Sequence, residues 1–220
     1  MTNWRTIRET LPADVTLLAV SKYHSVEQIA EAYAEGCRDF GESRVQELKL
    51  KRAFLPNDIR WHFIGHLQTN KVRDLLRLRP GLIQSVDSLH LLQAINNEAA
   101  KQGLVQDILL ELHVAREETK SGMSIDEFRE LCTANLPPLT ANRYPNIRLC
   151  GVMGMATNTD DEQEIRRCFR TLHEQFAWLK QQADHAPLIL SMGMTDDYPL
   201  AIEEGTTMIR LGSAVFGDKL

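Results

Sequence analysis

Short apolar runs alternate with longer amphipathic segments along the whole sequence. Each apolar run has the length of a strand, and the segment after it carries apolar residues at helical spacing. The run "VTLLAV" (15–20), for example, precedes "VEQIAEAYAEG" (26–36), which Ser25 can cap and Gly36 can end. The other strand candidates cover 37–41, 59–65, 81–88, 105–114, 146–155, 187–194 and 206–212. This alternation limits the possible folds more than any other feature.

Strands that alternate with helices pair in parallel through right-handed crossovers. Eight such units in 220 residues favour an α/β fold with a single (β/α)8 barrel of the TIM type, and an open doubly wound sheet is the alternative. With 43% hydrophobic residues the chain can bury one core, so we expect one domain over 1–220. The proline-rich stretch 136–145 is then a helix-to-strand connection and not a linker.

Composition excludes several classes of protein. The first fifteen residues lack the apolar core of a signal peptide, and no apolar run is long enough to span a bilayer, so we expect a cytoplasmic protein. Four well-separated cysteines indicate reduced thiols. The formal charge of −5 argues against a binder of nucleic acid or anionic membrane. The basic runs "RVQELKLKR" (44–52) and "KVRDLLRLR" (71–79) are expected to be solvated helix faces, with Glu42 and Glu47 in capping or surface pairs.

A lysine stands where the first predicted strand ends. In a barrel, residues at the carboxyl ends of the strands converge on one face, which is where barrel enzymes place their chemistry. Lys22 follows "LLAVS", and shelter by the barrel would disfavour its charged form. Because a neutral amine condenses with aldehydes, Lys22 is a candidate for a Schiff base, with an ordinary rim lysine as the alternative.

Two glycine-bearing segments follow the last two predicted strands. In "SMGM" and "RLGS", Gly193 and Gly212 would let the backbone approach a phosphate, while Ser191 and Ser213 would donate hydroxyl groups and Met192 a backbone N–H. The neighbouring Asp196 and Asp197 would repel a phosphate, so we assign them to capping the next helix. A reactive lysine and a phosphate site on one face fit pyridoxal 5′-phosphate (PLP), or the sugar-phosphate substrate of an aldolase.

Metal chemistry has little support in the sequence. His62 and His66 have HxxxH spacing, but the residues between them resemble a strand end and no third ligand is marked. We therefore expect no metal site, and His62 is expected to be a hydrogen-bonded residue of the core or rim.

Seven blocks in order resemble one family. They are "AVSK", "DFGESRVQE", "WHFIGHLQTNK", "SVDS", "KSGM", "GVMGMAT" and "LSMGMTDDYPLAIEEGTTMIRLGSAVFG". Together they resemble the PLP homeostasis protein family, also called the YggS or proline synthetase co-transcribed family. "FGESR" resembles its cyanobacterial branch, and Ser43 stands where members often have asparagine.

The resemblance implies a single barrel like the amino-terminal domain of alanine racemase, with an extra N-terminal helix. It implies PLP held as a Schiff base on Lys22, phosphate binding by Ser191, Met192, Gly193, Gly212 and Ser213, and Arg210 near the pyridine nitrogen. The implied function is intracellular PLP (vitamin B6) homeostasis and amino and keto acid balance, with PLP-dependent apoenzymes as transient recipients.

An arginine at the pyridine nitrogen has a chemical consequence. Because it stays charged, it cannot accept the proton that would make PLP a strong electron sink. Alanine racemase also uses a tyrosine from a second domain, and this chain stops at Leu220. We therefore expect no catalytic residues, no strong catalysis and a monomer. The alternatives are a slow PLP-dependent racemase or deaminase, and a PLP-free aldolase.

Overall fold

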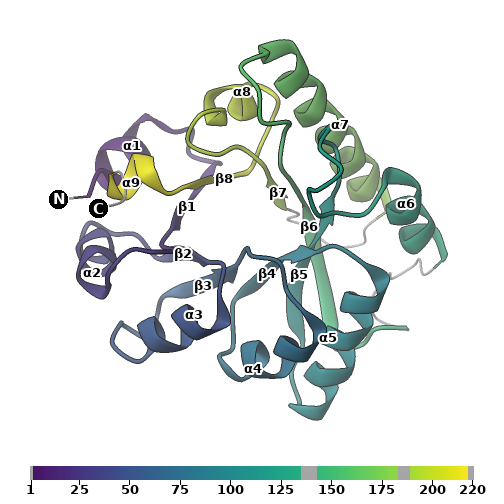
Figure 1. The fold of residues 1–220 in the computed structure, drawn as a ribbon, viewed down its shortest axis with the longest axis horizontal. Helices are drawn as coiled ribbons and strands as arrows, with labels where there is room; N and C mark the ends of the chain where they lie inside the picture. The colour runs from purple at the N-terminus through teal and green to yellow at the C-terminus, as the bar shows by residue number, and fades with distance from the viewer. Residues whose placement is uncertain (1, 135–142, 183–188, 218–220) are drawn as a thin grey trace.

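A closed barrel of parallel strands forms the centre of the molecule. The computed structural model describes residues 2–134, 143–182 and 189–217. Within them, eight strands pair in chain order and the last pairs with the first, with the helices outside (Figure 1). The strands are β1 (Thr16–Val20), β2 (Asp39–Glu42), β3 (Arg60–Phe63), β4 (Leu82–Val86), β5 (Gln106–Leu112), β6 (Ile147–Gly154), β7 (Ile189–Ser191) and β8 (Met208–Leu211). The predicted (β/α)8 barrel is confirmed, and the open sheet is excluded.

The helices follow the strands as the alternation predicts. They are α1 (Trp4–Thr10), α2 (Val26–Ala34), α3 (Val45–Arg52), the 3-10 turn η1 (Thr69–Lys71), α4 (Val72–Arg77), α5 (Leu89–Lys101), α6 (Ile125–Ala134), α7 (Glu162–Gln182), α8 (Tyr198–Glu203) and α9 (Ser213–Phe216). The cap predicted at Ser25 is present and takes the form of a capping box, because Ser25 and Gln28 exchange side-chain and backbone hydrogen bonds. Among the described residues, no helix is both long and apolar enough to cross a membrane.

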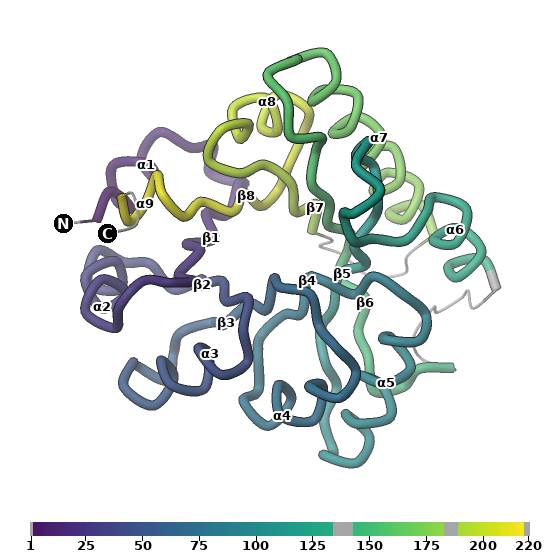
Figure 2. Tube along the Cα trace, in the orientation of Figure 1, coloured from purple at the N-terminus to yellow at the C-terminus, as the bar shows by residue number. Residues whose placement is uncertain are grey.

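The barrel closes where the two ends of the chain meet. β1 and β8 pair over four residues, from Thr16 opposite Met208 to Ala19 opposite Leu211. The predicted extra helix α1 lies beside α9 (Figure 2), and the Asn3 backbone N–H donates to the Val215 carbonyl at 2.8 Å. The first and last described helices therefore lie together on the outside of the closing strands.

Two predicted segments differ from the structure. Within the strand expected over 187–194, β7 covers Ile189–Ser191, residues 187–188 lie outside the described residues, and Gly193 has φ +94°, which is not a strand conformation, although its carbonyl still accepts from the Arg210 N–H. Most of the predicted connection 136–145 lies outside the described residues.

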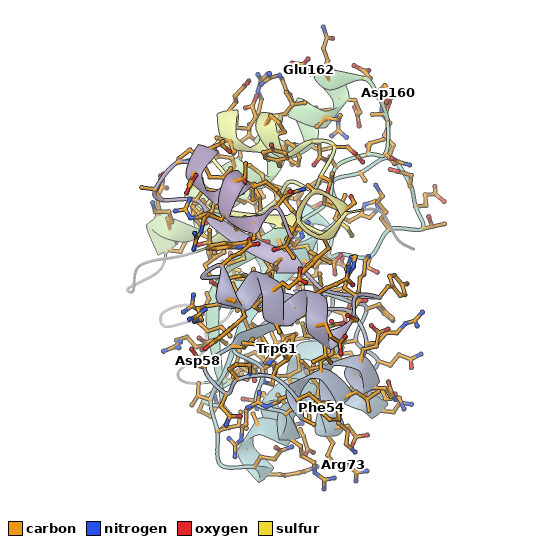
Figure 3. All side chains as sticks on the ribbon, turned by 90° about the vertical axis from the view of Figure 1, so that its left-hand side faces the viewer. Phe54, Asp58, Trp61, Arg73, Asp160 and Glu162 are labelled. Atoms are coloured by element: carbon orange, nitrogen blue, oxygen red, sulfur yellow. The ribbon has the colours of Figure 1, made fainter. Side chains whose placement is uncertain are left out.

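The core has an outer layer and an inner one. The large apolar layer lies between strands and helices and includes Trp61 and Phe63 of β3, whereas Phe54, which follows the end of α3, is exposed (Figure 3 labels Trp61 and Phe54). The inner layer contains a small apolar cluster of Leu82, Leu109 and Met153. It also contains polar groups, since Gln84 Nε2 of β4 contacts Met208 Sδ of β8 at 3.2 Å. These strands are not neighbours, so their side chains meet inside the barrel.

One glycine is required where β6 passes β7. Gly151 has φ +142°, and a Cβ atom there would lie 1.9 Å from the Ile189 carbonyl oxygen. Gly103 also has a positive φ (+62°), but an added Cβ would meet nothing within 4 Å. We expect Gly151→Ala to lower the free energy of unfolding by about 3 kcal/mol or more, because the backbone of β7 must move. Gly103→Ala should cost about 1 kcal/mol, from its φ alone. Urea denaturation measures both, and equal losses would contradict the steric argument.

Candidate functional site

A cleft of about 310 Å³ lies at the carboxyl ends of β1, β6 and β8. Of the seven predicted site residues, Lys22, Arg210, Gly212 and Ser213 line it, and Ser191, Met192 and Gly193 do not. The remaining lining residues are Val20, His24, Ile64, Met153, Met155, Met194, Thr195, Asp196 and Gly217. The barrel thus brings together residues that are about 190 positions apart in the sequence.

Lys22 lies in the turn between β1 and α2, and its side chain is exposed. The expectation that the barrel shelters this lysine is therefore wrong, because the turn after β1 leaves its side chain exposed. The preceding Ser21 is fully buried and the following Tyr23 is exposed. The side chain of Lys22 can reach into the cleft from a turn whose backbone is held on both sides.

A buried ion pair holds the backbone before Lys22. Lys51 of α3 donates to Glu42 Oε1 at 2.6 Å and to the Ser21 carbonyl at 2.8 Å, and the Ser21 hydroxyl donates to the same Glu42 oxygen at 2.7 Å. Glu42 has no exposed surface and Lys51 only 7%. The predictions of a solvated basic face for Lys51 and of a capping or surface role for Glu42 are therefore wrong.

A strained residue holds the backbone after Lys22. Tyr23 has φ +69°, a left-handed conformation that is uncommon for a bulky residue. Its backbone N–H donates to Glu47 Oε2 at 3.2 Å, and Glu47 also lies 3.4 Å from Lys51 Nζ. Glu42, Glu47 and Lys51 therefore form one network beneath the Lys22 turn.

Arg210 approaches the cleft from inside the barrel and is 5% exposed. Its Nη1 donates to Ser191 Oγ at 2.7 Å and its Nη2 to the Gly154 carbonyl at 3.0 Å. Burial lowers the pKa of Arg210 to about 10, while the charges of Glu111 and Asp197 favour the protonated form. The guanidinium is therefore a fixed cation at neutral pH.

Three predicted residues have other roles in the structure. The Ser191 hydroxyl donates to Gln84 Oε1 at 2.7 Å as it accepts from Arg210, and the Met192 N–H donates to the Met208 carbonyl. A Cβ atom on Gly193 would lie 2.6 Å from Ala201 Cβ of α8. The Ser191 hydroxyl and the Met192 N–H therefore already have partners within the protein, and Gly193 is needed for the close approach of α8.

Further hydrogen-bond donors lie on the loops around Thr195 and Ser213. The Ser213 hydroxyl donates to Thr195 Oγ1 at 3.3 Å, and both residues line the cleft. Within the described part of the chain, the backbone N–H of Ser213 has no hydrogen-bond partner. Asp196 also lines the cleft, and Asp197 accepts from the Met194 N–H at 2.6 Å instead of capping α8 with its side chain. The predicted capping role of this pair is therefore wrong.

Glu111 of β5 is 3% exposed, and no sequence pattern predicted a role for it. Burial, and then the charge of Asp87, raises the pKa of Glu111 to about 7, although Arg210 and His66 act in the opposite direction. His66 is itself exposed and pairs with Asp87 at 3.2 Å, whereas His62 is buried. The two histidines therefore do not face a common ligand.

The Glu42–Lys51 pair gives a stability prediction. Lys51→Met leaves the Glu42 carboxylate buried without a cation, so we expect a loss of about 3–5 kcal/mol in the free energy of unfolding. Lys49→Met on the same helix changes an exposed lysine and should cost less than about 0.5 kcal/mol. Chemical denaturation tests this, and Glu42→Gln combined with Lys51→Met should recover part of the loss. Equal effects of the two single variants would contradict a buried pair.

Glu111 gives a pH prediction. A folded-state pKa of about 7, against an ordinary 4.5, means that the folded protein binds this proton more tightly than the unfolded chain. Stability from this group is therefore present below pH 4.5 and is lost as pH rises to 7, by roughly 3 kcal/mol at about 1.4 kcal/mol per pKa unit. Glu111→Gln should gain stability relative to the unmodified protein between pH 5 and pH 8. Thermal unfolding at both pH values measures this, with the exposed Glu9→Gln as control. A difference that does not change with pH would contradict it.

Comparisons with known proteins agree with the geometry. A family model described as alanine racemase, N-terminal domain, matches residues 1–219. The pyridoxal phosphate homeostasis protein of Aquifex aeolicus is 39% identical over 204 residues, which cover 92% of this chain and 86% of that protein.

Solved structures extend the likeness to the fold. PipY of the cyanobacterium Synechococcus elongatus, solved with PLP bound, is 37% identical with a TM-score of 0.84, over 96% of this chain and 97% of PipY. Alanine racemase from Streptomyces coelicolor shares the fold at 17% identity, with a TM-score of 0.79 over 96% of this chain and 56% of that one. The resemblance found in the sequence is confirmed: the chain belongs to the pyridoxal phosphate homeostasis protein family, built on the alanine racemase N-terminal domain.

Proposed function

We propose that this protein binds PLP in the cleft and serves intracellular PLP homeostasis and amino and keto acid balance, without strong catalytic activity. The observation that carries the proposal is that Lys22, Arg210 and Ser213 line one cleft. An amine, a fixed cation and hydroxyl donors suit a ligand with an aldehyde and a phosphate. The PLP-bound structure of the relative PipY supports the same ligand.

Each cleft residue has a proposed role toward PLP. Lys22 would hold the aldehyde as a Schiff base, and Gly212, Ser213 and Thr195 would surround the phosphate. Arg210 would face the ring nitrogen. When bound, PLP supplies an aldehyde that condenses with amines and a ring that can accept negative charge. Ser191, Met192 and Gly193 would hold the cleft residues in place, through the hydrogen bonds of Ser191 and Met192 and the packing of Gly193 against α8.

Weak catalysis is part of the proposal. Arg210 is charged and already donates to Ser191 and Gly154, so it cannot take a proton from the ring nitrogen. The described residues that line the cleft include no tyrosine to serve as an opposing acid or base. These features favour holding the cofactor over turning over an amino acid.

Release to other proteins completes the proposal. A hollow of about 660 Å³ adjoins the cleft and shares Met155, Met194 and Asp196 with it, so the bound cofactor would have an open side. We propose that a monomer, one PLP-binding barrel over 1–220, passes PLP to apoenzymes in the cytoplasm. The four free cysteines suit a reducing compartment.

The Schiff base gives a direct test. The purified protein with added PLP should show imine absorbance, and borohydride should fix the cofactor to Lys22 irreversibly. Lys22→Ala should abolish both signals, because Lys22 is the one lysine among the described residues that line the cleft. Lys101→Ala, which changes an exposed lysine on α5, should leave both unchanged. Mass spectrometry of the reduced adduct locates the modified residue.

Three outcomes would overturn parts of this proposal. Absence of imine absorbance in the unmodified protein would exclude the Schiff base. A reducible adduct that survives in Lys22→Ala would move it to another lysine. Rapid turnover of an L-amino acid would replace the non-catalytic role with that of a PLP-dependent enzyme.

A further inference from the structure

A chain of hydrogen bonds runs from Arg210 through the interior of the barrel. Arg210 Nη1 lies 2.7 Å from Ser191 Oγ, and Ser191 Oγ lies 2.7 Å from Gln84 Oε1. Gln84 Nε2 lies 2.9 Å from His62 Nδ1, and His62 Nε2 lies 3.2 Å from Asp39 Oδ1. The five residues come from β8, β7, β4, β3 and β2.

This chain of hydrogen bonds is shielded from water over most of its length. Ser191 and Gln84 have no exposed surface, and His62 and Arg210 have 5% each. Polar groups at such positions must be paired within the protein, since an unmade hydrogen bond there costs the full desolvation of the group. The loss of one member would therefore disturb its neighbours instead of being repaired by solvent.

The donors and acceptors along the chain all run in one direction. Arg210 can only donate, so the Ser191 oxygen accepts and its proton goes to the Gln84 carbonyl. The Gln84 amide nitrogen then donates to His62 Nδ1, which places the proton of His62 on Nε2, facing Asp39. With His62 neutral and the Gln84 amide oriented in this way, each group donates to the next one along the series.

Asp39 closes the chain as an anion. Arg60 Nε donates to Asp39 Oδ1 at 2.7 Å. Burial alone would raise the pKa of Asp39, but the hydrogen bonds from His62 and Arg60 outweigh it and hold the pKa at about 2. Asp39 begins β2, at the amino ends of the strands, whereas Arg210 reaches the cleft at the carboxyl ends. The chain therefore links the two ends of the barrel.

We propose that Ser191, Gln84 and His62 are positioning residues that fix the Arg210 guanidinium in the cleft and tie it to the Asp39 carboxylate at the far end of the barrel. This inference rests on the proposed function for its consequence, which is the state of the cofactor's ring nitrogen. A fixed guanidinium keeps a donor directed at that nitrogen, and a loose one lets water and protons reach it.

The first test uses the protein without cofactor. Gln84→Met removes the central amide at nearly constant volume. Gln106→Met is the matched control, because Gln106 is also a buried glutamine, 2% exposed. Its amide donates to the carbonyls of Pro80 and Asp107, which are not part of the hydrogen-bond chain. The measurement is hydrogen exchange of the Arg210 guanidinium by 15N NMR. We expect exchange about tenfold faster in Gln84→Met, the change expected from one weakened hydrogen bond, and no change in Gln106→Met.

The second test uses rescue at His62. His62→Gln can still accept from Gln84 and donate to Asp39, whereas His62→Leu can do neither. With PLP labelled at the ring nitrogen, His62→Leu and Gln84→Met should move the 15N shift and its pH dependence, and His62→Gln should retain the unmodified signal. A purely structural role would not separate the two His62 variants.

Two results would overturn the inference. One is equal Arg210 exchange in Gln84→Met and Gln106→Met, and the other is equal behaviour of His62→Gln and His62→Leu. Should Gln84→Met not fold, the His62 pair and Ser191→Ala give the same comparison. Failure of the unmodified protein to bind PLP would refute the proposed function alone, since the exchange measurement needs no cofactor.

Discussion

Arg210 is a cation inside a closed barrel, and its burial would cost several kcal/mol if its N–H groups were left without partners. The end of β6 supplies one partner, the Gly154 carbonyl, and β7 supplies the Ser191 hydroxyl. Gly154 also lets α7 pack closely, because a Cβ atom there would lie 2.6 Å from Leu172 Cδ2 and this side chain would have to shift. The packing of α7, the strand ends and the orientation of the guanidinium therefore depend on one another.

The two basic side chains of the cleft, Arg210 and Lys22, differ in burial. Arg210 is buried and held by two strands, whereas Lys22 is exposed and only its neighbours along the backbone are held. The left-handed conformation of Tyr23 costs of order 1 kcal/mol, and the hydrogen bond to Glu47 with the buried Glu42–Lys51 pair offsets it. Such a turn places an amine accurately while leaving its side chain free to approach an aldehyde.

The fold could be predicted because its signal is local. Strand and helix periods are visible in windows of ten residues, and parallel closure follows from the alternation. The ends of the strands then predicted Lys22, Arg210, Gly212 and Ser213 at one cleft. The partners of Ser191 and Gly193 could not be predicted in the same way. These residues meet α8 and the barrel interior, and such partners are distant in sequence.

The errors arose where a local pattern conflicts with a distant partner. Lys51 belongs to a basic run with helical spacing, which is typical of a solvated face, yet its ammonium reaches Glu42 under the sheet. Glu111 stands in the strand "LLELHV", where alternation alone predicts that it shares a face with Leu109. This face becomes the barrel interior near Arg210 only when the sheet closes. Closure joins strands that are far apart in the sequence, so a short segment does not predict it.

The acids near Arg210 also explain how its charge remains usable. Glu111 and Asp197 stabilise the guanidinium through their charges and not through a hydrogen bond to it. Its direct partners, Ser191 and Gly154, are uncharged. A carboxylate bonded directly to Arg210 would neutralise the cation and compete with a ligand for its N–H groups. Because uncharged acceptors hold the guanidinium and the anions stay at a distance, its positive charge remains directed at whatever occupies the cleft.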